Sequence, residues 1–440
     1  MDRRKFLGLM AASGCGFLTL SSQIQADDDE NTRTASLFAV PSNTRISGHI
    51  VIVGGGMAGA TLAKYLRLWG GTSVRVTLVE KATAYTSNIM SNLVLNGQKD
   101  LVELDYSHSI LAGHYGVTLL NGEARAIDIN RKIVLLNDGA SLQYDRLVLA
   151  PGLDFDLLPG MQSLSEYDTQ IPHAWKAGAQ TQLLRDQLLA MPAGGNVVIS
   201  IPPTPYRCPP GPYERACIVA DWLKANKPGS KVIVLDANAD IVVEKDNFLD
   251  AFNRVHAGII DYRPNAVLTQ VDSGARTIAF TQNGIAQQLT ASVFNPIPPQ
   301  RAPKLLADAG LLNSPDGRYA AVDVLSYKST QSQNVHIIGD ASQTTQPKAG
   351  HIANQQAKVC ADAILRLLAG QLPDPAPVTN SACYSPITAA TATWLSAVYQ
   401  YNSTNGVMEL SKLSASSGAT IGNYADMHTW FNTLMQDSFA

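Results

Sequence analysis

The stretch His49-Ile-Val-Ile-Val-Gly-Gly-Gly-Met-Ala-Gly59 decides the fold of this 440-residue chain. Its apolar half has the composition of a short buried strand, and its glycines stand at the G-x-G-x-x-G spacing. Apolar residues at helical spacing continue from Met57 to Leu68, so a helix is predicted to open on the glycines. A strand, a glycine turn and a helix in this order are typical of a dinucleotide-binding β-α-β unit.

The residues after this helix fit the same unit. Val74 to Val79 predicts a second strand, and Glu80 stands at its end, 21 residues after Gly59. Glycines allow a tight turn and close approach of the backbone to a pyrophosphate, the helix N-terminus favours negative charge, and a carboxylate can bind ribose hydroxyls. A merely tight β-α turn is the alternative. The predicted cofactor contacts here are Gly54, Gly56, Met57, Ala58, Gly59, Glu80 and Lys81.

A second motif, Ile337-Ile338-Gly339-Asp340, favours FAD over NAD. A late strand that ends in Gly-Asp is similar to the second FAD motif of the glutathione-reductase-type flavoproteins, in which the aspartate binds the ribityl chain. Asp340 is therefore a predicted contact, with a strand-end cap as the alternative. The helix predicted over 354–368 follows Lys348, and its N-terminus could stabilise negative charge on the flavin. Lys348 fits such a site and an ordinary solvated surface equally well.

The order of predicted elements indicates two α/β units and a smaller C-terminal piece. Strands are predicted over 144–150, 196–200, 231–235 and 334–340, and a helix over 175–191. The predicted fold class is α/β, with two Rossmann-like three-layer nucleotide-binding domains of the glutathione-reductase type and a small C-terminal α+β domain. The predicted boundaries are 1–26 for a signal peptide, 27–46 for a linker, 47–160 and 296–370 for the FAD-binding domain, 161–295 for a degenerate second Rossmann-like domain, and 371–440 for the C-terminal domain.

Composition and the N-terminus narrow the class and the destination. Hydrophobic residues make up 45% and charged residues 16%, which is typical of a globular protein, and a net charge of −3 leaves no basic footprint for nucleic acid. Twin arginines in Asp2–Leu7 precede an apolar run to Leu20 and a plausible cleavage site at Ile24–Ala26. This order predicts a twin-arginine signal and a periplasmic protein. The run is too short to span a bilayer, and no transmembrane segment is expected in the mature chain.

Four cysteines remain after the predicted leader. Cys217 and Cys360 lie in helical patterns and are predicted to be small core residues. Cys208 lies among six prolines between 202 and 212, which deny it a helix or a central strand. Cys383 also falls outside any clear helix, and we pair it with Cys208. From the residues alone, a structural disulfide and a redox-active one are both open.

Several unusual strings resemble the flavoprotein subunit of flavocytochrome c sulfide dehydrogenase, over nearly the whole chain after the leader. The most specific strings are Pro205–Glu214, Ile171–Lys176, Ile297–Ala302, Pro347–His351 and Ala382–Ser385. The resemblance implies that Cys208 and Cys383 are the catalytic residues and form a redox-active disulfide beside the flavin. It also implies that hydrosulfide attacks one sulfur by ordinary exchange chemistry, which gives a persulfide and frees the other cysteine as a thiolate. That thiolate is then expected to pass two electrons to FAD.

The same resemblance implies a c-type cytochrome as the electron acceptor. The chain has no C-x-x-C-H, so the haem is expected on a separate protein. Its eight histidines form no cluster with metal-ligand spacing, so no metal site is predicted.

One position departs from the family pattern. Typical members carry a cysteine that links covalently to the flavin in a string ending Met-Ser-Asn-Leu-Val-Leu, and here Asn88 stands in its place. An amide cannot form a thioether. Non-covalent FAD is therefore predicted, with Asn88 beside it.

Three other functions fit parts of the sequence. A sulfide:quinone oxidoreductase shares the flavin–disulfide arrangement but needs an apolar or basic amphipathic segment, and the apolar stretch 427–435 lacks basic residues. An NAD(P)H-dependent disulfide reductase needs a phosphate loop where residues 202–212 carry prolines. A non-enzymatic flavoprotein partner of a sulfur-oxidising complex is the third alternative.

Overall fold

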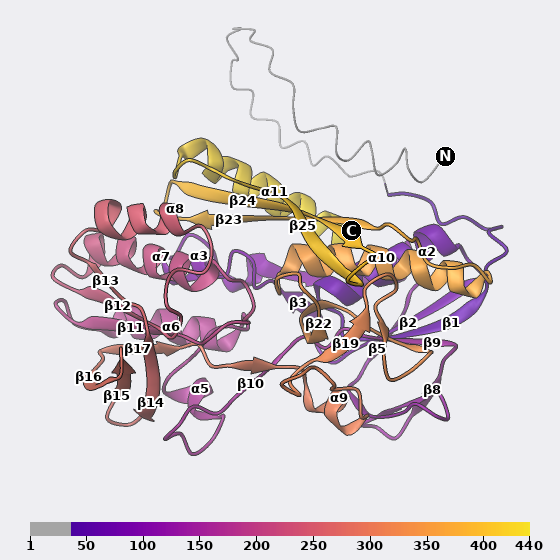
Figure 1. Cartoon of the computed structure of the whole chain (residues 1–440), viewed down its shortest axis with the longest axis horizontal. Helices are drawn as coiled ribbons and strands as arrows, with labels where there is room; N and C mark the ends of the chain where they lie inside the picture. The colour runs from indigo at the N-terminus through magenta and orange to yellow at the C-terminus, as the bar shows by residue number, and fades with distance from the viewer. Residues whose placement is uncertain (1–36) are drawn as a thin grey trace, which may run out of the picture. The chain divides into compact units, whose positions relative to one another are not determined.

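The quoted stretch begins the central strand of an eight-stranded sheet, in a computed structural model that describes residues 37–440 (Figure 1). The predicted signal peptide and the first part of the linker lie outside the described residues. The strand order is β22-β19-β20-β21-β9-β1-β2-β5, and β21, β9, β1, β2 and β5 run parallel. The strands are β1 Gly48–Val53, β2 Val74–Glu80, β5 Thr118–Asn121, β9 Arg146–Leu149, β19 Ala320–Asp323, β20 Lys328–Ser329, β21 Val335–Ile337 and β22 Ser342–Gln343.

Strand β1 is buried on both faces because the sheet is the middle of three layers. Ile50 and Ile52 face the helices α2 (Met57–Gly70) and α10 (Gly350–Leu368), which pack against each other. Val51 and Val53, which alternate with them along β1, face a small antiparallel sheet on the other side. That sheet consists of β6 Ala124–Asp128, β7 Ile133–Leu136 and β8 Ser141–Gln143. Helix α10 begins at Gly350, four residues before the predicted start.

A second parallel sheet has the order β13-β12-β11-β17 and lies beside the first unit in Figure 1. Helices α6 (Ala179–Ala190) and α7 (Gly211–Asn226) cover one face, and the antiparallel sheet β14-β15-β16 covers the other. The predicted fold class is thereby confirmed. The strands are β11 Asn196–Ile201, β12 Lys231–Asp236, β13 Ile260–Arg263, β14 Ala266–Asp272, β15 Thr277–Gln282, β16 Ile285–Thr290 and β17 Val293–Pro296.

The helix predicted from Trp175 is wrong at its start, since α6 begins at Ala179. Gly178 has φ +140, a backbone conformation that interrupts a helix, and its N–H donates to the Thr181 hydroxyl oxygen. The four residues before α6 are therefore loop, and the first of them, Trp175, lines the cavity described below.

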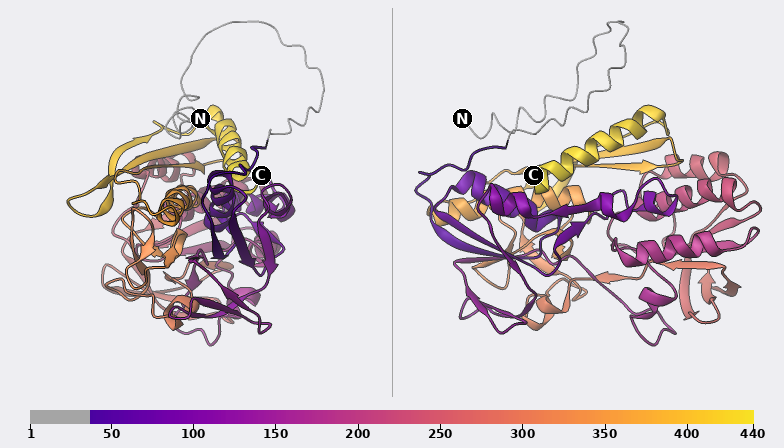
Figure 2. Two further views of the ribbon diagram at one scale, coloured as in Figure 1. Left: turned by 90° about the vertical axis from the view of Figure 1, so that its right-hand side faces the viewer. Right: turned by 180° about the vertical axis from the view of Figure 1, so that it is seen from behind.

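The C-terminal part is an antiparallel sheet of β23 (Val378–Pro386), β24 (Ala392–Asn402) and β25 (Val407–Ala415), covered by α11 (Ile421–Phe439). Strand β23 contacts both α10, which covers the first parallel sheet, and α7, which covers the second. Helix α11, yellow in Figures 1 and 2, runs along β24 and reaches α2 with its C-terminal end. The C-terminal part thus joins the two parallel units.

Short elements complete the chain: β3 Ala84–Thr86, α3 Asn92–Leu95, η2 Leu101–Leu104, β4 Asp105–Ser107, α4 Ser109–Gly113, β10 Asp154–Phe155, α5 Glu166–Thr169, α8 Lys245–Asp250, η3 Ala251–Val255, β18 Gln300–Arg301, α9 Lys304–Asp308 and η4 Gly339–Ala341. Within residues 37–440, every helix is too short or too polar to cross a bilayer.

Candidate active site

A cavity with about 1270 Å³ of empty space, counted to its open mouth, lies where the three parts meet. It is lined by the start of α2, the carboxyl end of β21, the start of α10, the proline loop before α7, strand β23 and helix α11. The ends of two parallel units and one antiparallel sheet therefore face a common space. Ligands of α/β folds bind at such carboxyl ends of parallel strands.

The glycine loop divides into structural and open positions. Gly54 has φ +103, and a Cβ there would lie 2.3 Å from the Ala150 carbonyl oxygen. A Cβ on Gly59 would lie 1.8 Å from the Gly54 carbonyl oxygen. A Cβ on Gly56 would meet nothing nearer than the Tyr85 ring at 3.6 Å, and Gly56 lines the cavity. Packing thus requires Gly54 and Gly59 of the three motif glycines, whereas Gly56 leaves space for a ligand at the N-terminus of α2.

Glu80 and Lys81 lie outside the cavity wall. The Glu80 carboxylate accepts hydrogen bonds from the N–H groups of Gly55 at 2.6 Å and Ala82 at 2.9 Å. The Lys81 ammonium pairs with Glu123 at 2.7 Å on the surface. Glu80 therefore joins the glycine loop to the end of β2.

Asp340 and Lys348 occupy different positions around the cavity. The Asp340 carboxylate lines it, 3.4 Å from the Arg207 guanidinium. The Lys348 ammonium does not line it, because it donates to the carbonyl oxygens of Asp340 at 2.7 Å and Ser342 at 3.0 Å. Burial lowers the pKa of Lys348 to about 8. Its carbonyl oxygen accepts the Cys208 N–H at 2.7 Å, so this lysine positions the thiol loop.

Asn88 lines the cavity, and its side-chain oxygen accepts the Ala177 N–H at 2.8 Å. The amide thereby connects the loop after β3 with the loop before α6. Met57 and Ala58, at the start of α2, line the cavity as well.

The structure separates the four described cysteines into two pairs. Cys208 and Cys383 both line the cavity, although they are far apart in the chain. Cys217 and Cys360 are fully buried in separate cores. All four are free thiols in this structure. Cys208 has φ +57, a backbone conformation that costs a non-glycine residue about 1–3 kcal/mol and is often found at functional sites.

Both cavity thiols hold their protons strongly. Burial raises the pKa of Cys208 well above its usual value, and the charges of Glu214 and of an ionised Cys383 add to the rise. Burial raises the pKa of Cys383 to about 12, with contributions from Glu244 and Glu214. A reduced pair would therefore be neutral at pH 7, and a thiolate formed here would be a strong base.

Glu214 is a cavity residue that the sequence did not reveal. It lies in the first turn of α7 and accepts a hydrogen bond from the Asn92 side-chain N–H at 2.7 Å. Burial raises its pKa to about 8, although the Asn92 bond acts in the opposite direction. At neutral pH this carboxyl is protonated and can give a proton to a nearby sulfur.

Arg215, the next residue, is a second cavity residue that the sequence did not reveal. Its guanidinium is buried and donates to Asn92 at 2.8 Å, Asn295 at 2.9 Å, and the carbonyl oxygens of His173 and Ala174. It also lies 4.7 Å from the centre of the Trp175 ring. Burial lowers its pKa to about 10, which leaves it cationic at neutral pH. It provides a fixed positive charge and holds the loop before α6.

The surroundings of Cys383 are held by buried polar groups. The His351 ring nitrogen Nδ1 accepts the Ala382 N–H at 3.0 Å, and burial lowers the pKa of His351 to about 4. On the same strand, Ser385 donates to Glu244 at 3.2 Å. Sequence patterns cannot show these contacts, because the partners come from separate elements.

The residues present fit an FAD on three observations. Gly56 leaves open space at a helix N-terminus, the Asp340 carboxylate faces the same cavity, and the cavity extends from both to the two thiols. The indole N–H of Trp430, in the cavity wall, is buried without a hydrogen-bond partner among residues 37–440. A ligand with acceptor atoms would satisfy it.

Two sequence families match parts of the chain. Residues 48–197 match the pyridine nucleotide-disulphide oxidoreductases, and residues 181–298 match the central part of the sulfide dehydrogenase (flavocytochrome c) flavoprotein chain. A benzene 1,2-dioxygenase system ferredoxin–NAD(+) reductase subunit of Pseudomonas putida is 31% identical over 156 residues, which is 32% of this chain and 34% of that protein. The chain spans about a third or less of the first curated relatives it matches.

Longer similarities point the same way. The mitochondrial sulfide:quinone oxidoreductase of Dictyostelium discoideum is 22% identical over 321 residues, covering 70% of this chain and 69% of that protein. The solved sulfide:quinone oxidoreductase of Aquifex aeolicus superposes with a TM-score of 0.71 at 16% identity, covering 89% of this chain and 92% of the other. A putidaredoxin reductase, solved in complex with putidaredoxin, superposes with a TM-score of 0.62 at 18% identity, covering 89% of this chain and 94% of the other. The fold is that of FAD-dependent disulfide oxidoreductases, and the matches support a flavoprotein related to sulfide dehydrogenase and sulfide:quinone oxidoreductase.

Proposed function

We propose that the protein is a periplasmic FAD-dependent sulfide dehydrogenase that oxidises sulfide to sulfur or polysulfide. The observation that carries this proposal is the presence of Cys208 and Cys383 in the same cavity as the glycine loop and Asp340. Two sulfurs next to a dinucleotide site are the parts that a disulfide oxidoreductase needs. The similarity to sulfide-oxidising flavoproteins supports sulfide as the electron donor.

The first step is ordinary thiol–disulfide exchange at a Cys208–Cys383 bond. The sulfur of hydrosulfide bonds to one cysteine sulfur, the disulfide breaks, and its electron pair leaves on the other cysteine as a thiolate. Because the surroundings of both sulfurs raise their pKa values, a neutral Glu214 can protonate this thiolate and later recover the proton. Arg215 supplies a positive charge that favours entry of an anion.

The cofactor would be held by the glycine loop at its pyrophosphate and by Asp340 at its ribityl chain. Bound FAD supplies a two-electron acceptor next to the sulfurs. The hydrogen bonds from Cys208 N–H to the Lys348 carbonyl and from Ala382 N–H to His351 hold the two sulfur-bearing segments in place.

We propose a c-type cytochrome on a separate chain as the acceptor and export through the twin-arginine signal. Anaerobic sulfide added to the FAD-loaded protein tests the function. Bleaching of the flavin absorbance, followed by reduction of added cytochrome c, is the expected result. A flavin that stays oxidised would favour the non-enzymatic partner and contradict the proposal.

A quinone acceptor is the second candidate function. It is favoured by the similarity to two sulfide:quinone oxidoreductases. It is also favoured by a pair of aromatic side chains in the cavity wall, Tyr384 and Trp430, whose ring centres lie 5.4 Å apart. Reoxidation of the sulfide-reduced protein by a soluble quinone but not by cytochrome c would select this function.

Glu214→Gln should remove a pH dependence centred near 8 and slow flavin reduction about 100-fold. In the wild type the rate should fall as the pH rises through about 8, because the proton donor is lost. Stopped-flow reduction by sulfide across this range measures both effects. A pH profile unchanged in the variant would exclude Glu214 as the donor.

The same carboxyl should affect folding stability. An unfolded glutamate ionises near its usual pKa of 4.5, whereas folded Glu214 keeps its proton to about pH 8. The protonated carboxyl therefore contributes to the free energy of unfolding. This contribution is complete below the pKa of the unfolded state, and it is lost as the pH rises through the pKa of the folded state. Between those values the wild type should lose stability relative to Glu214→Gln, measured by thermal unfolding at several pH values.

Acid precipitation should release all of the flavin into the supernatant. The reason is that Asn88, which lines the cavity, has no sulfur to form a thioether. Absorbance of the supernatant and the pellet measures this. Yellow colour retained in the washed pellet would show a covalent link elsewhere.

A further inference from the structure

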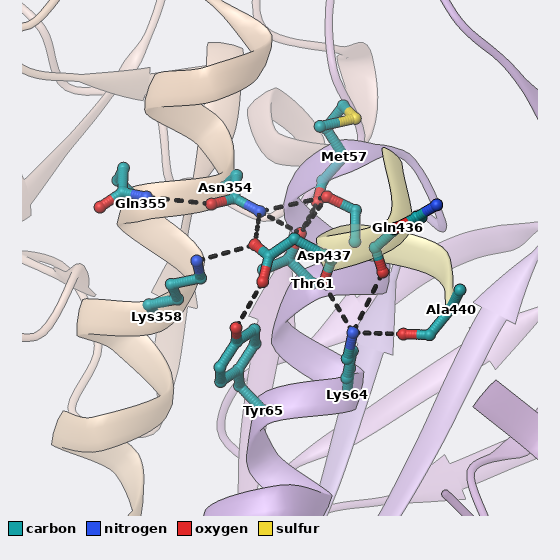
Figure 3. Close-up of polar contacts among 11 residues, drawn as sticks. Met57, Thr61, Lys64, Tyr65, Asn354, Gln355, Lys358, Gln436, Asp437 and Ala440 are labelled. Atoms are coloured by element: carbon teal, nitrogen blue, oxygen red, sulfur yellow. Dashed lines mark hydrogen bonds and ion pairs between the residues drawn. The ribbon is translucent and has the colours of Figure 1, made fainter. Parts of the chain in front are cut away.

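The last five residues, Gln436–Ala440, lie across α2 and α10 and are called the tail below. Figure 3 shows their polar contacts, which come from both helices. The tail is the last turn of α11 with its C-cap residue, and earlier residues of the same helix, Met427 and Trp430, line the cavity. It is therefore continuous with one wall of the proposed cofactor site.

A buried charge anchors the tail. The Asp437 carboxylate accepts from the Lys358 ammonium at 2.7 Å, the Asn354 side-chain N–H at 2.7 Å and the Tyr65 hydroxyl at 2.5 Å. The exposed fractions of the Lys358 and Asp437 side chains are only 18% and 16%. A largely buried pair with two further hydrogen bonds is costly to break, because the remaining charge would lack a partner.

A second cation holds the tail backbone. The Lys64 ammonium, on α2, donates to the carbonyl oxygens of Gln436 and Asp437, each at 3.1 Å, and to that of Ala440. Burial lowers the pKa of Lys64 to about 8. Lysine at the C-terminal carbonyls of a helix is favourable, since those groups have no partner within the helix.

These anchors bring one aromatic ring to the outer side of the glycine loop. Phe439 is 3% exposed, and its ring is stacked on Tyr85 with centroids 5.2 Å apart and planes at 10°. It also lies 5.9 Å from the His108 ring, whose Nε2 is 2.7 Å from the Gly55 carbonyl oxygen.

Tyr85 is the residue that connects the tail to the cavity. It lines the cavity, and its ring is the nearest group to the space left open at Gly56. A phenylalanine packed behind it restricts the ring to one place. Without that support, Tyr85 could turn into the space that the pyrophosphate needs.

We propose that the tail is a positioning element of the dinucleotide site, with Phe439 acting through Tyr85. The inference rests on the proposed binding of FAD. It differs from a purely structural role of the tail, which would alter folding stability but not the affinity of the folded protein for FAD. A positioning role changes that affinity.

Titration of the apoprotein with FAD, followed by flavin fluorescence, measures the effect. Phe439→Leu should bind FAD about three- to ten-fold more weakly, as expected for the loss of one stacked aromatic pair. Phe439→Tyr, which keeps a ring in place, should restore most of the affinity. Asp437→Asn should weaken binding about two- to five-fold by loosening the anchor.

The control is Phe280→Leu. Phe280 is 1% exposed in the core between β14–β16 and the second parallel sheet, and it is absent from the cavity wall. This variant should lose comparable thermal stability and keep wild-type FAD affinity. Equal affinity of wild type and Phe439→Leu would overturn the inference, as would equal weakening in Phe280→Leu.

A double variant tests the route through Tyr85. If Phe439 acts through this ring, Tyr85→Leu and Tyr85→Leu/Phe439→Leu should bind FAD about equally. If the losses of FAD affinity in the two single variants add up in the double variant, Phe439 does not act through Tyr85. A wild-type apoprotein that binds no FAD would instead refute the proposed function on which the inference rests.

Discussion

Cys208→Ser should lower the rate of flavin reduction by sulfide about a thousand-fold or more and leave FAD bound. Serine has nearly the shape of cysteine but cannot form a disulfide, so hydrosulfide has no sulfur–sulfur bond to attack. The cavity is otherwise preserved, because the Cys208 N–H keeps its hydrogen bond to the Lys348 carbonyl. Anaerobic stopped-flow absorbance and the flavin content of the purified variant provide the two measurements.

Four other cysteine variants make this result specific. Cys383→Ser should be as slow as Cys208→Ser, and the double variant should be no slower, since the two sulfurs act as one unit. Cys217→Ser and Cys360→Ser replace fully buried thiols that do not line the cavity and should affect only stability. Fast reduction in Cys208→Ser would refute the disulfide mechanism.

Gly59→Ala should lower the free energy of unfolding by about 3 kcal/mol and remove FAD binding. The new methyl group would lie 1.8 Å from the Gly54 carbonyl oxygen, a backbone atom that cannot move alone. Gly54 is itself held at φ +103 beside Ala150, so α2 must shift away from β1. Denaturant unfolding of the apoprotein measures the loss without interference from the cofactor.

Two glycines serve as controls. Gly113→Ala lies at the end of α4 with nothing within 4 Å of the added methyl, and its stability should change by less than about 1 kcal/mol. Gly56→Ala should also keep its stability, because its nearest neighbour is 3.6 Å away, yet it should lose FAD affinity. Wild-type stability of Gly59→Ala would contradict the packing argument.

Most of the fold could be predicted because local patterns specify it. The glycine loop, strands β1, β2, β11 and β12, and the two buried helical cysteines depend on residues close together in the sequence. Gly178 could have corrected the start of α6, since glycine is among the residues favoured at a helix N-cap, the position that it occupies here.

The rest of the site depends on contacts between distant residues. Glu214 and Arg215 carry no sequence signal of their own within a helical pattern, and only the fold brings both to Asn92. Lys348 is adjacent to the cavity in the fold, but its ammonium donates to the Asp340 carbonyl oxygen, a contact that the sequence does not show. Burial, which sets the pKa values of these groups, is a property of the tertiary structure alone.

The position of β23 has a consequence for how the molecule behaves during turnover. Cys383 lies on β23 and Cys208 lies in the loop before α7, far away in the sequence, so a bond between them would be a cross-link over a long loop. Each catalytic cycle would cut and restore that cross-link, which is worth about 5 kcal/mol for a loop of this length. The contacts at Lys348, His351 and Glu244 are made by backbone N–H groups and a serine hydroxyl, not by the two sulfurs. They would keep the opened ends in register, so that re-closure is a local event and not a refolding step.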